Sequence, residues 1–274
     1  MENKIDILTS EHIKDIKKSI GEFPKEGPIT YSYKLSEKFL SNIFIKSRWL
    51  QNLDAYSIRA LYYKISKINK REFIIIGDEA LLHELMWIKT STHLDFTPIL
   101  IMPDNGGNYP HTKDIKIIKH GKNLEETKKE ALNIVKTRNL PYINTYEDPD
   151  IISTYGTVAL EFLRDEKSLE IIIVPITHGT LISGISIFIK EILPQIKIIG
   201  VYRENRLFLN RKTSSIIKKY VDTIYPVGKS TIRDIQKIYK EELENEFFAK
   251  DLLPIAFLFE EKIITKNKSI GLIL

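Results

Sequence analysis

The segment that decides the fold is Lys46-Ser-Arg-Trp-Leu-Gln-Asn-Leu-Asp-Ala-Tyr-Ser-Ile-Arg-Ala-Leu61. An apolar run typical of a strand, residues 42–45, precedes it. Its second half leads into residues 58–65, whose apolar spacing is typical of a helix. The segment therefore marks a point where a strand ends and a helix begins, and Ser57 lies at that junction.

Short apolar runs rich in isoleucine and valine alternate with helical patterns along the rest of the chain. The predicted strands are residues 73–77, 98–102, 115–118, 170–175 and 198–202. Short, apolar strands separated by helices are typical of parallel sheets that are covered on both faces. The sequence therefore predicts an α/β fold.

Composition excludes several classes of function. Of the 274 residues, 43% are hydrophobic and 28% are charged, which is ordinary for a globular protein. The net charge is +5, but basic and acidic residues are interleaved, so no nucleic-acid partner is expected. The absence of cysteine excludes disulfides, thiolate metal sites and a cysteine nucleophile, and no metal site is predicted.

Hydropathy predicts no association with a membrane. Residues 1–6 carry charge where a secretory signal would be apolar, and no apolar run approaches the roughly 20 residues that span a bilayer. The expected location is therefore the cytoplasm.

Residues 46–61 resemble the active-site segment of the threonine dehydratase family and its serine racemase relatives, K-R-E-D-L-Q-P-x-G-S-F-K-I-R-G-A. Without a gap, the positions that keep this pattern are Lys46, Leu50, Gln51, Ile58 and Arg59. In that family the lysine of S-F-K binds pyridoxal phosphate (PLP), and the alignment puts Ser57 in its place.

The resemblance continues along most of the chain in the family's order. Residues 153–161 are similar to A-G-Q-G-T-I-A-L-E, residues 174–184 to V-P-V-G-G-G-G-L-I-S-G, and residues 199–204 to I-G-V-E-P-E. The resemblance implies the two-domain, tryptophan-synthase-β-like body of fold type II PLP enzymes, and a homodimer. It also implies a large domain of residues 1–49 and 148–274, with a smaller domain of residues 50–147 inserted.

One helix of the smaller domain is expected to be truncated or lost. Between Met102 and Gly121 the chain is four residues shorter than the family pattern, and Asp-Asn-Gly-Gly-Asn stands where a helix would start.

The parts of the family's cofactor site are altered together. An imine with PLP needs a primary amine, which the hydroxyl of Ser57 cannot supply. The ring-side loop S-x-G-N-H aligns with Glu79-Ala-Leu-Leu-His83, so two leucines fill the space of Gly and Asn.

The phosphate loop and the last strand are altered too. Three of the four phosphate-loop glycines are replaced, and the segment reads Thr177, His178, Gly179, Thr180. Threonine hydroxyls and the start of a helix predict that this loop holds a smaller anion. The final residues, 268–274, resemble the strand before the family's pyridine-contact turn, and the sequence stops before that turn.

These changes favour a pseudoenzyme, a threonine-dehydratase-like protein with a binding, regulatory or scaffold role and no PLP cofactor. One alternative is a PLP-independent enzyme in a remodelled interdomain cleft; another is residual PLP-dependent lyase activity on a hydroxy amino acid. The candidates for chemistry in such a cleft are Ser57, Asp54, Tyr56, Glu79, His83 and His178.

Overall fold

The computed structural model describes residues 8–47, 49–50, 53–104, 113–242, 251–260 and 266–274. Its helices are α1 (Ser10–Ile20), α2 (Tyr33–Phe39), α3 (Ala55–Ser66), α4 (Glu79–Ser91), α5 (Leu124–Arg138), α6 (Pro149–Asp165), α7 (Thr180–Ile192), α8 (Arg211–Tyr220), α9 (Lys229–Glu242) and α10 (Leu253–Phe259). Its strands are β1 (Ile29–Tyr31), β2 (Asn42–Lys46), β3 (Trp49–Leu50), β4 (Leu53–Asp54), β5 (Glu72–Ile76), β6 (Thr97–Met102), β7 (Lys116–Lys119), β8 (Tyr142–Ile143), β9 (Ile171–Pro175), β10 (Lys197–Arg203), β11 (Thr223–Val227) and β12 (Ser269–Ile273).

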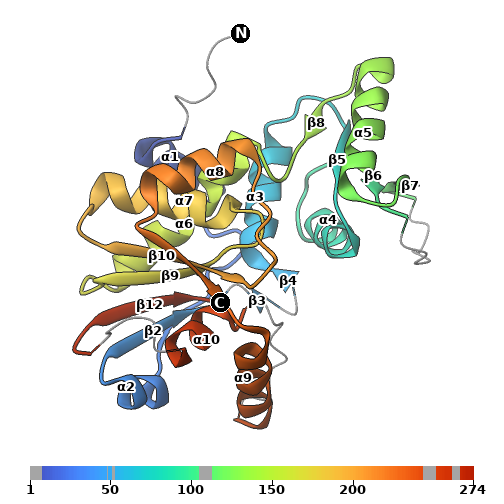
Figure 1. Ribbon diagram of the computed structural model, residues 1–274. Helices are drawn as coiled ribbons and strands as arrows, with labels where there is room; N and C mark the ends of the chain where they lie inside the picture. Colours follow the sequence, from blue (N-terminus) through green and yellow to red (C-terminus); the bar gives the residue numbers. More distant parts are fainter. Residues whose placement is uncertain (1–7, 48, 51–52, 105–112, 243–250, 261–265) are drawn as a thin grey trace.

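The larger sheet has six strands in the order β1-β2-β12-β9-β10-β11. All its neighbouring pairs are parallel except β1 with β2. One face buries Ile172 and Val174 with α6, α7 and α8, and the other buries Ile171 and Ile173 with α9 and α10. Figure 1 shows these helices as layers above and below the sheet. Helices on both faces explain why β9 is apolar at every position, as expected for a buried parallel strand.

The smaller sheet is parallel throughout, in the order β7-β6-β5-β8. Phe73 and Ile75 pack on one face with the leucines of α4, whereas Ile74 and Ile76 pack on the other with α5. This sheet and its two helices form the lobe that Figure 1 shows beside the larger one.

The predicted α/β class with parallel sheets is confirmed, and the predicted strands match β5, β6, β7, β9 and β10 to within a residue or two at each end. The junction after Lys46 also has the predicted order, because β2 precedes α3. The predicted loss of a helix between Met102 and Gly121 falls largely on residues 105–112, which lie outside the described residues.

We retain the domain division at residues 50 and 147 as a proposal. The strands of the four-stranded sheet fall inside it, and those of the six-stranded sheet fall outside it. Among the described residues, no helix combines the length and the hydrophobicity needed to cross a bilayer.

Candidate functional site: the cavity between the lobes

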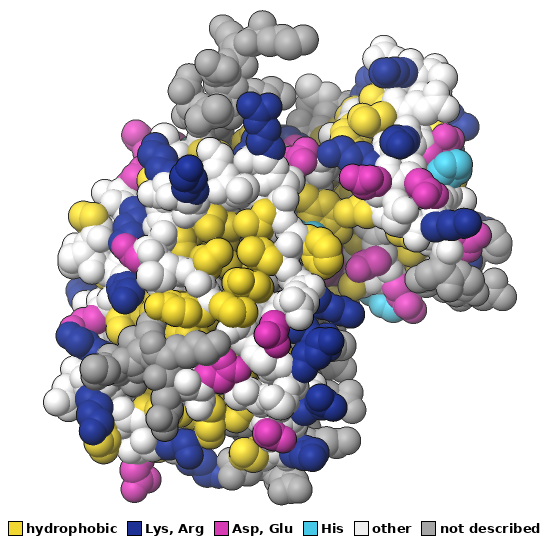
Figure 2. Space-filling view, viewed as in Figure 1, with side chains coloured by type: hydrophobic (Ala, Val, Ile, Leu, Met, Phe, Trp, Pro, Cys, Tyr) yellow, Lys and Arg dark blue, Asp and Glu magenta, His cyan; other side chains and the backbone are white. Residues whose placement is uncertain are grey.

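A cavity of about 280 Å³ lies where the first turns of α3, α4 and α7 meet. Its lining includes Gly77 at the end of β5 in the smaller lobe and Pro175 at the end of β9 in the larger lobe. Figure 2 shows the surface hollowed between the two lobes. Ligands in open α/β folds commonly bind beyond the carboxyl ends of parallel strands, which is the position of this cavity.

Two of the three helices begin with an aspartate that caps the helix. The Asp54 carboxylate accepts hydrogen bonds from the backbone N–H groups of Tyr56 and Ser57, each at 3.1 Å. The Asp78 carboxylate accepts one from the N–H of Leu81 at 3.2 Å. These carboxylates accept hydrogen bonds from backbone N–H groups that a helix leaves unpaired at its start. The caps therefore fix the first turns of α3 and α4 at the wall of the cavity.

Ser57 is hydrogen bonded to a buried carboxylate. Its hydroxyl donates to Glu84 Oε2 at 2.6 Å, and Glu84 is only 6% exposed. Both residues line the cavity, Ser57 from the first turn of α3 and Glu84 from the second turn of α4. Ser57, which the sequence placed at the junction of strand and helix, therefore connects the α3 wall of the cavity to the α4 wall through this hydrogen bond.

The loop after β9 forms the third wall. Thr177, His178 and Thr180 line the cavity, and the His178 ring lies 4.4 Å from the ring centroid of Tyr146. Gly179 has a φ of +86°, in the left-handed region that L side chains rarely adopt, and a Cβ there would lie within 3.0 Å of Thr213. This backbone requirement accounts for the single glycine that the loop keeps.

Carboxylates dominate the electrostatics of the cavity. Its described lining contains Asp54, Asp78 and Glu84 and includes no lysine or arginine. Burial, together with the negative charges of Asp78 and Glu84, raises the pKa of Tyr146 to about 12. The cavity therefore favours ligand groups that are cationic or that donate hydrogen bonds.

Comparison with known proteins relates the chain to PLP enzymes. A family model described as "Pyridoxal-phosphate dependent enzyme" matches residues 111–242. Maize serine racemase superposes with a TM-score of 0.83 at 19% identity, over 97% of this chain and 92% of that structure. Threonine deaminase isoform 2 from Solanum lycopersicum superposes with a TM-score of 0.78 at 21% identity, over 99% of this chain and 84% of that structure.

The chain therefore shares the fold of fold type II PLP-dependent enzymes.

In sequence, the chain is similar to threonine dehydratases. The L-threonine ammonia-lyase of Thermotoga maritima is 26% identical over 261 residues, which are 83% of this chain and 65% of that protein. A biosynthetic L-threonine dehydratase from Pasteurella multocida is 26% identical over 74% of this chain and 41% of its own length. The chain thus spans between two fifths and two thirds of the length of these two relatives.

The structure brings together three of the six candidates for chemistry in a remodelled cleft. Asp54, Ser57 and His178 line the cavity, together with the loop threonines. The Tyr56 side chain is 3% exposed and does not line the cavity; its hydroxyl lies 3.5 Å from the backbone oxygen of Lys46.

The segment aligned with the ring-side loop of the fold type II family is helical here. Glu79 is the first residue of α4, and both Glu79 and His83 are exposed and do not line the cavity. Leu81 does line it and is 6% exposed, whereas Leu82 is fully buried in the core of the smaller lobe. The cavity thus remains partly polar. The side chain of Trp49 lies outside what the structure describes.

The polar residues of the cavity that sequence reasoning missed include Asp78, Glu84 and Tyr146. A signal for Glu84 was present, because it lies three residues after Leu81 and four before Ile88, both of which are buried. A carboxylate on the apolar face of a helix needs a buried partner, and that requirement points to a polar site. For Tyr146, which lies in the turn before α6, the sequence offers no comparable signal.

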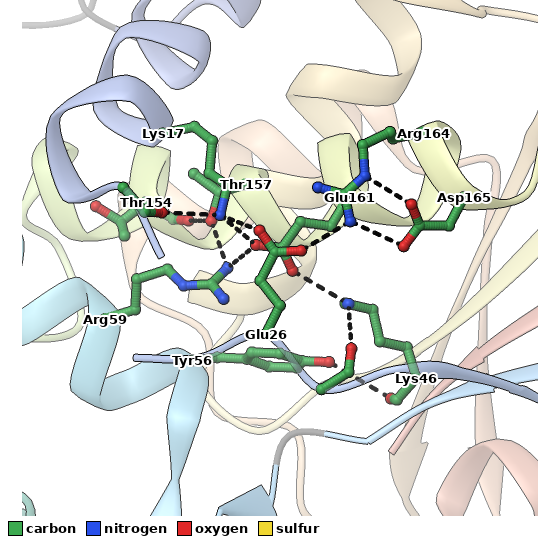
Figure 3. Close-up of polar contacts among 12 residues, drawn as sticks. Lys17, Glu26, Lys46, Tyr56, Arg59, Thr154, Thr157, Glu161, Arg164 and Asp165 are labelled. Atoms are coloured by element: carbon green, nitrogen blue, oxygen red, sulfur yellow. Dashed lines mark hydrogen bonds and ion pairs between the residues drawn. The ribbon is translucent and has the colours of Figure 1, made fainter. Parts of the chain in front are cut away.

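A buried ion network lies beside the cavity and fixes α3. Glu161 of α6 is fully buried, and its carboxylate lies 2.7 Å from Arg59 Nη1, 3.1 Å from Lys46 Nζ and 3.0 Å from Lys17 Nζ (Figure 3). Arg59 also donates to the Thr157 hydroxyl at 2.9 Å. Lys46 Nζ and Glu161 Oε2 form an ion pair, but their geometry is not that of a hydrogen bond. The network ties β2, α1, α3 and α6 together, and it includes Lys46 and Arg59, two residues that match the resembled segment.

Proposed function

We propose that this chain is a threonine-dehydratase-like pseudoenzyme that binds a small ligand in the cavity and forms no imine with PLP. The observation that carries the proposal is the hydrogen bond from Ser57 to Glu84, at the position where the resembled family has its lysine. A hydroxyl held by a carboxylate offers no amine to the cofactor aldehyde. The role that follows is binding, regulation or scaffolding.

The residues of the cavity do not fit PLP. The cofactor carries a phosphate dianion, and the described lining presents Asp54, Asp78 and Glu84 with no lysine or arginine to balance that charge. The lysines nearest in sequence are engaged elsewhere. Lys46 is buried against Glu161, and Lys64 lies 2.9 Å from Asp148 and 2.7 Å from Asp150.

The charge of the cavity supports a particular class of ligand. An ammonium group or another hydrogen-bond donor would be stabilised beside Glu84 and Asp78. We retain the segment Thr177, His178, Gly179 and Thr180 as the proposed anion contact. Gly179 makes no side-chain cap, and the first N–H groups of α7 favour negative charge.

Borohydride trapping tests the main proposal. The purified protein is incubated with PLP, reduced with borohydride and measured by intact-mass spectrometry, with the catabolic L-threonine dehydratase of Staphylococcus aureus, 28% identical, treated in parallel. We expect an adduct on the dehydratase and only scattered surface labelling here. A specific adduct on one lysine would contradict the proposal and would favour the residual lyase.

A PLP-independent enzyme is the second candidate, and the Ser57–Glu84 pair favours it. A carboxylate that accepts the hydroxyl proton of a serine is the arrangement of a base beside a nucleophile. A fluorophosphonate probe tests this reading, because it labels activated serines. Labelling of Ser57 that is lost in the Glu84→Gln variant would support the PLP-independent enzyme. If Ser57 is not labelled, the hypothesis of a binding protein without catalysis is favoured.

Oligomeric state and location also remain proposals. The resemblance to threonine dehydratases supports a homodimer and a cytoplasmic protein. Light scattering of the purified chain across a concentration series measures the first, and a monomer at every concentration would refute it.

A further inference from the structure

A second cavity lies on the other side of the loop that follows β9. It has a volume of about 310 Å³ and is lined by Thr177 and His178 together with Arg203, Arg206 and Phe208 from the end of β10 and the turn that follows. We call it the arginine pocket. Thr177 and His178 line both cavities, so a single loop separates the acidic cavity from the arginine pocket.

The arginine pocket has positive charge that the described protein does not neutralise. Its described lining contains no acidic residue, and neither Arg203 nor Arg206 makes an ion pair with a residue that the structure describes. Arg203 Nε is buried and has no hydrogen-bond partner there. An unpaired buried donor of a charged group is costly, and a ligand that supplied the acceptor would remove that cost.

A neighbouring cavity adds to the same charge. Arg203 also lines a space of about 290 Å³ with Lys229 and Arg233 from the first turns of α9. Seen from the side drawn in Figure 2, Lys and Arg side chains gather on the large lobe below the hollow, opposite acidic side chains of the smaller lobe. Basic side chains from β10, the turn after it and α9 thus lie close together at this edge of the large sheet.

The sequence at this edge departs from the pattern it resembles. In the alignment of residues 199–204 with I-G-V-E-P-E, Tyr202 replaces an acidic residue and Arg203 replaces a proline. The first change removes a negative charge from the end of β10, and the second adds a positive charge there. The charge of the arginine pocket thus belongs to this chain and is not part of the resemblance.

We propose that the arginine pocket binds the oxyanion of an aromatic ligand, a phosphate monoester or a carboxylate, through Arg203 and Arg206. Guanidinium groups match the geometry of both oxyanions and can donate two parallel hydrogen bonds to each. Phe208 is 64% exposed and offers an aromatic face for the body of the ligand. This inference does not depend on what the acidic cavity binds.

Isothermal titration calorimetry tests the proposal with three probes: phenyl phosphate, benzoate and inorganic phosphate, at constant ionic strength. We expect one of the two aromatic anions to bind more tightly than inorganic phosphate, and the tighter one identifies the class of oxyanion. Arg203→Gln and Arg206→Gln should each raise the Kd of the tighter-binding aromatic anion by about tenfold or more, since each substitution removes a charge-assisted hydrogen bond. Arg138→Gln, an exposed arginine at the end of α5, is the matched control and should leave the Kd unchanged.

Two results would overturn the proposal: no binding of either aromatic anion, or equal weakening in Arg138→Gln, which would mean non-specific attraction. Circular dichroism and thermal unfolding accompany each variant. Arg206 is exposed, so Arg206→Gln keeps the test decisive even if Arg203→Gln fails to fold.

Discussion

The substitution Glu161→Gln removes one buried negative charge from the ion network and keeps the shape of the side chain. Lys17 retains a second carboxylate, Glu26, as its partner. Lys46 and Arg59 do not, because Glu161 is their only carboxylate among the described residues, and their side chains are 1% and 2% exposed. The variant therefore leaves two buried cations that keep only neutral partners, the Gly27 carbonyl and the Thr157 hydroxyl.

Breaking a buried ion pair by removing one partner costs about 3–5 kcal/mol, which is a large share of the roughly 5–15 kcal/mol that stabilises a typical domain. We expect the free energy of unfolding of Glu161→Gln, measured by urea titration at neutral pH, to fall by an amount in that range. Asp15→Asn breaks an exposed pair with Lys18 at 3.2 Å and should cost about 0.5 kcal/mol or less. A loss below about 1 kcal/mol in Glu161→Gln would refute the reasoning, because it would mean that the buried cations do not need this charge.

Three further predictions concern pH, packing and chemistry. Burial acts to raise the pKa of Glu26, but hydrogen bonds from Lys17 and Arg164 outweigh it and lower the pKa from 4.5 to about 2. The stability that Glu26 contributes is therefore present above pH 4.5 and lost as the pH falls toward about 2, so urea titrations should show Glu26→Gln converging with the parent protein across that window; a constant difference would contradict this. Gly184→Ala would place a Cβ 2.1 Å from the backbone oxygen of Ile152, so it should separate α6 from α7 and cost about 1–3 kcal/mol or more in thermal unfolding, and an unchanged Tm would show that the helices yield freely. Ser57→Lys should form no trappable PLP imine and should not turn over threonine or serine, because Glu84 would pair with the new amine and the carboxylates of the cavity would remain; turnover would refute the proposed loss of function.

Local sequence patterns were sufficient to place most strands, because fully buried parallel strands need uninterrupted apolar runs and the chain interrupts them with clear helical spacing. The predicted helical run of residues 58–65 lies within α3, but the helix begins three residues earlier, where Asp54 caps it. The ring-side segment was harder. Asp78 caps α4 and makes Glu79 a helical residue, so the direction of each later side chain depends on which helix face meets the core.

The sequence by itself determined the α/β class, the resemblance to threonine dehydratases and the replacement of the expected lysine by Ser57, because these depend on residue type and order along the chain. The tertiary structure decided which polar groups share one cavity. Glu84 reaches Ser57 and Arg203 meets the loop after β9 only because separate helices and strands are packed together in space. Charge in a cavity is a sum over residues far apart in sequence, so the acidic character of one cavity and the basic character of the other appear only once the chain is folded.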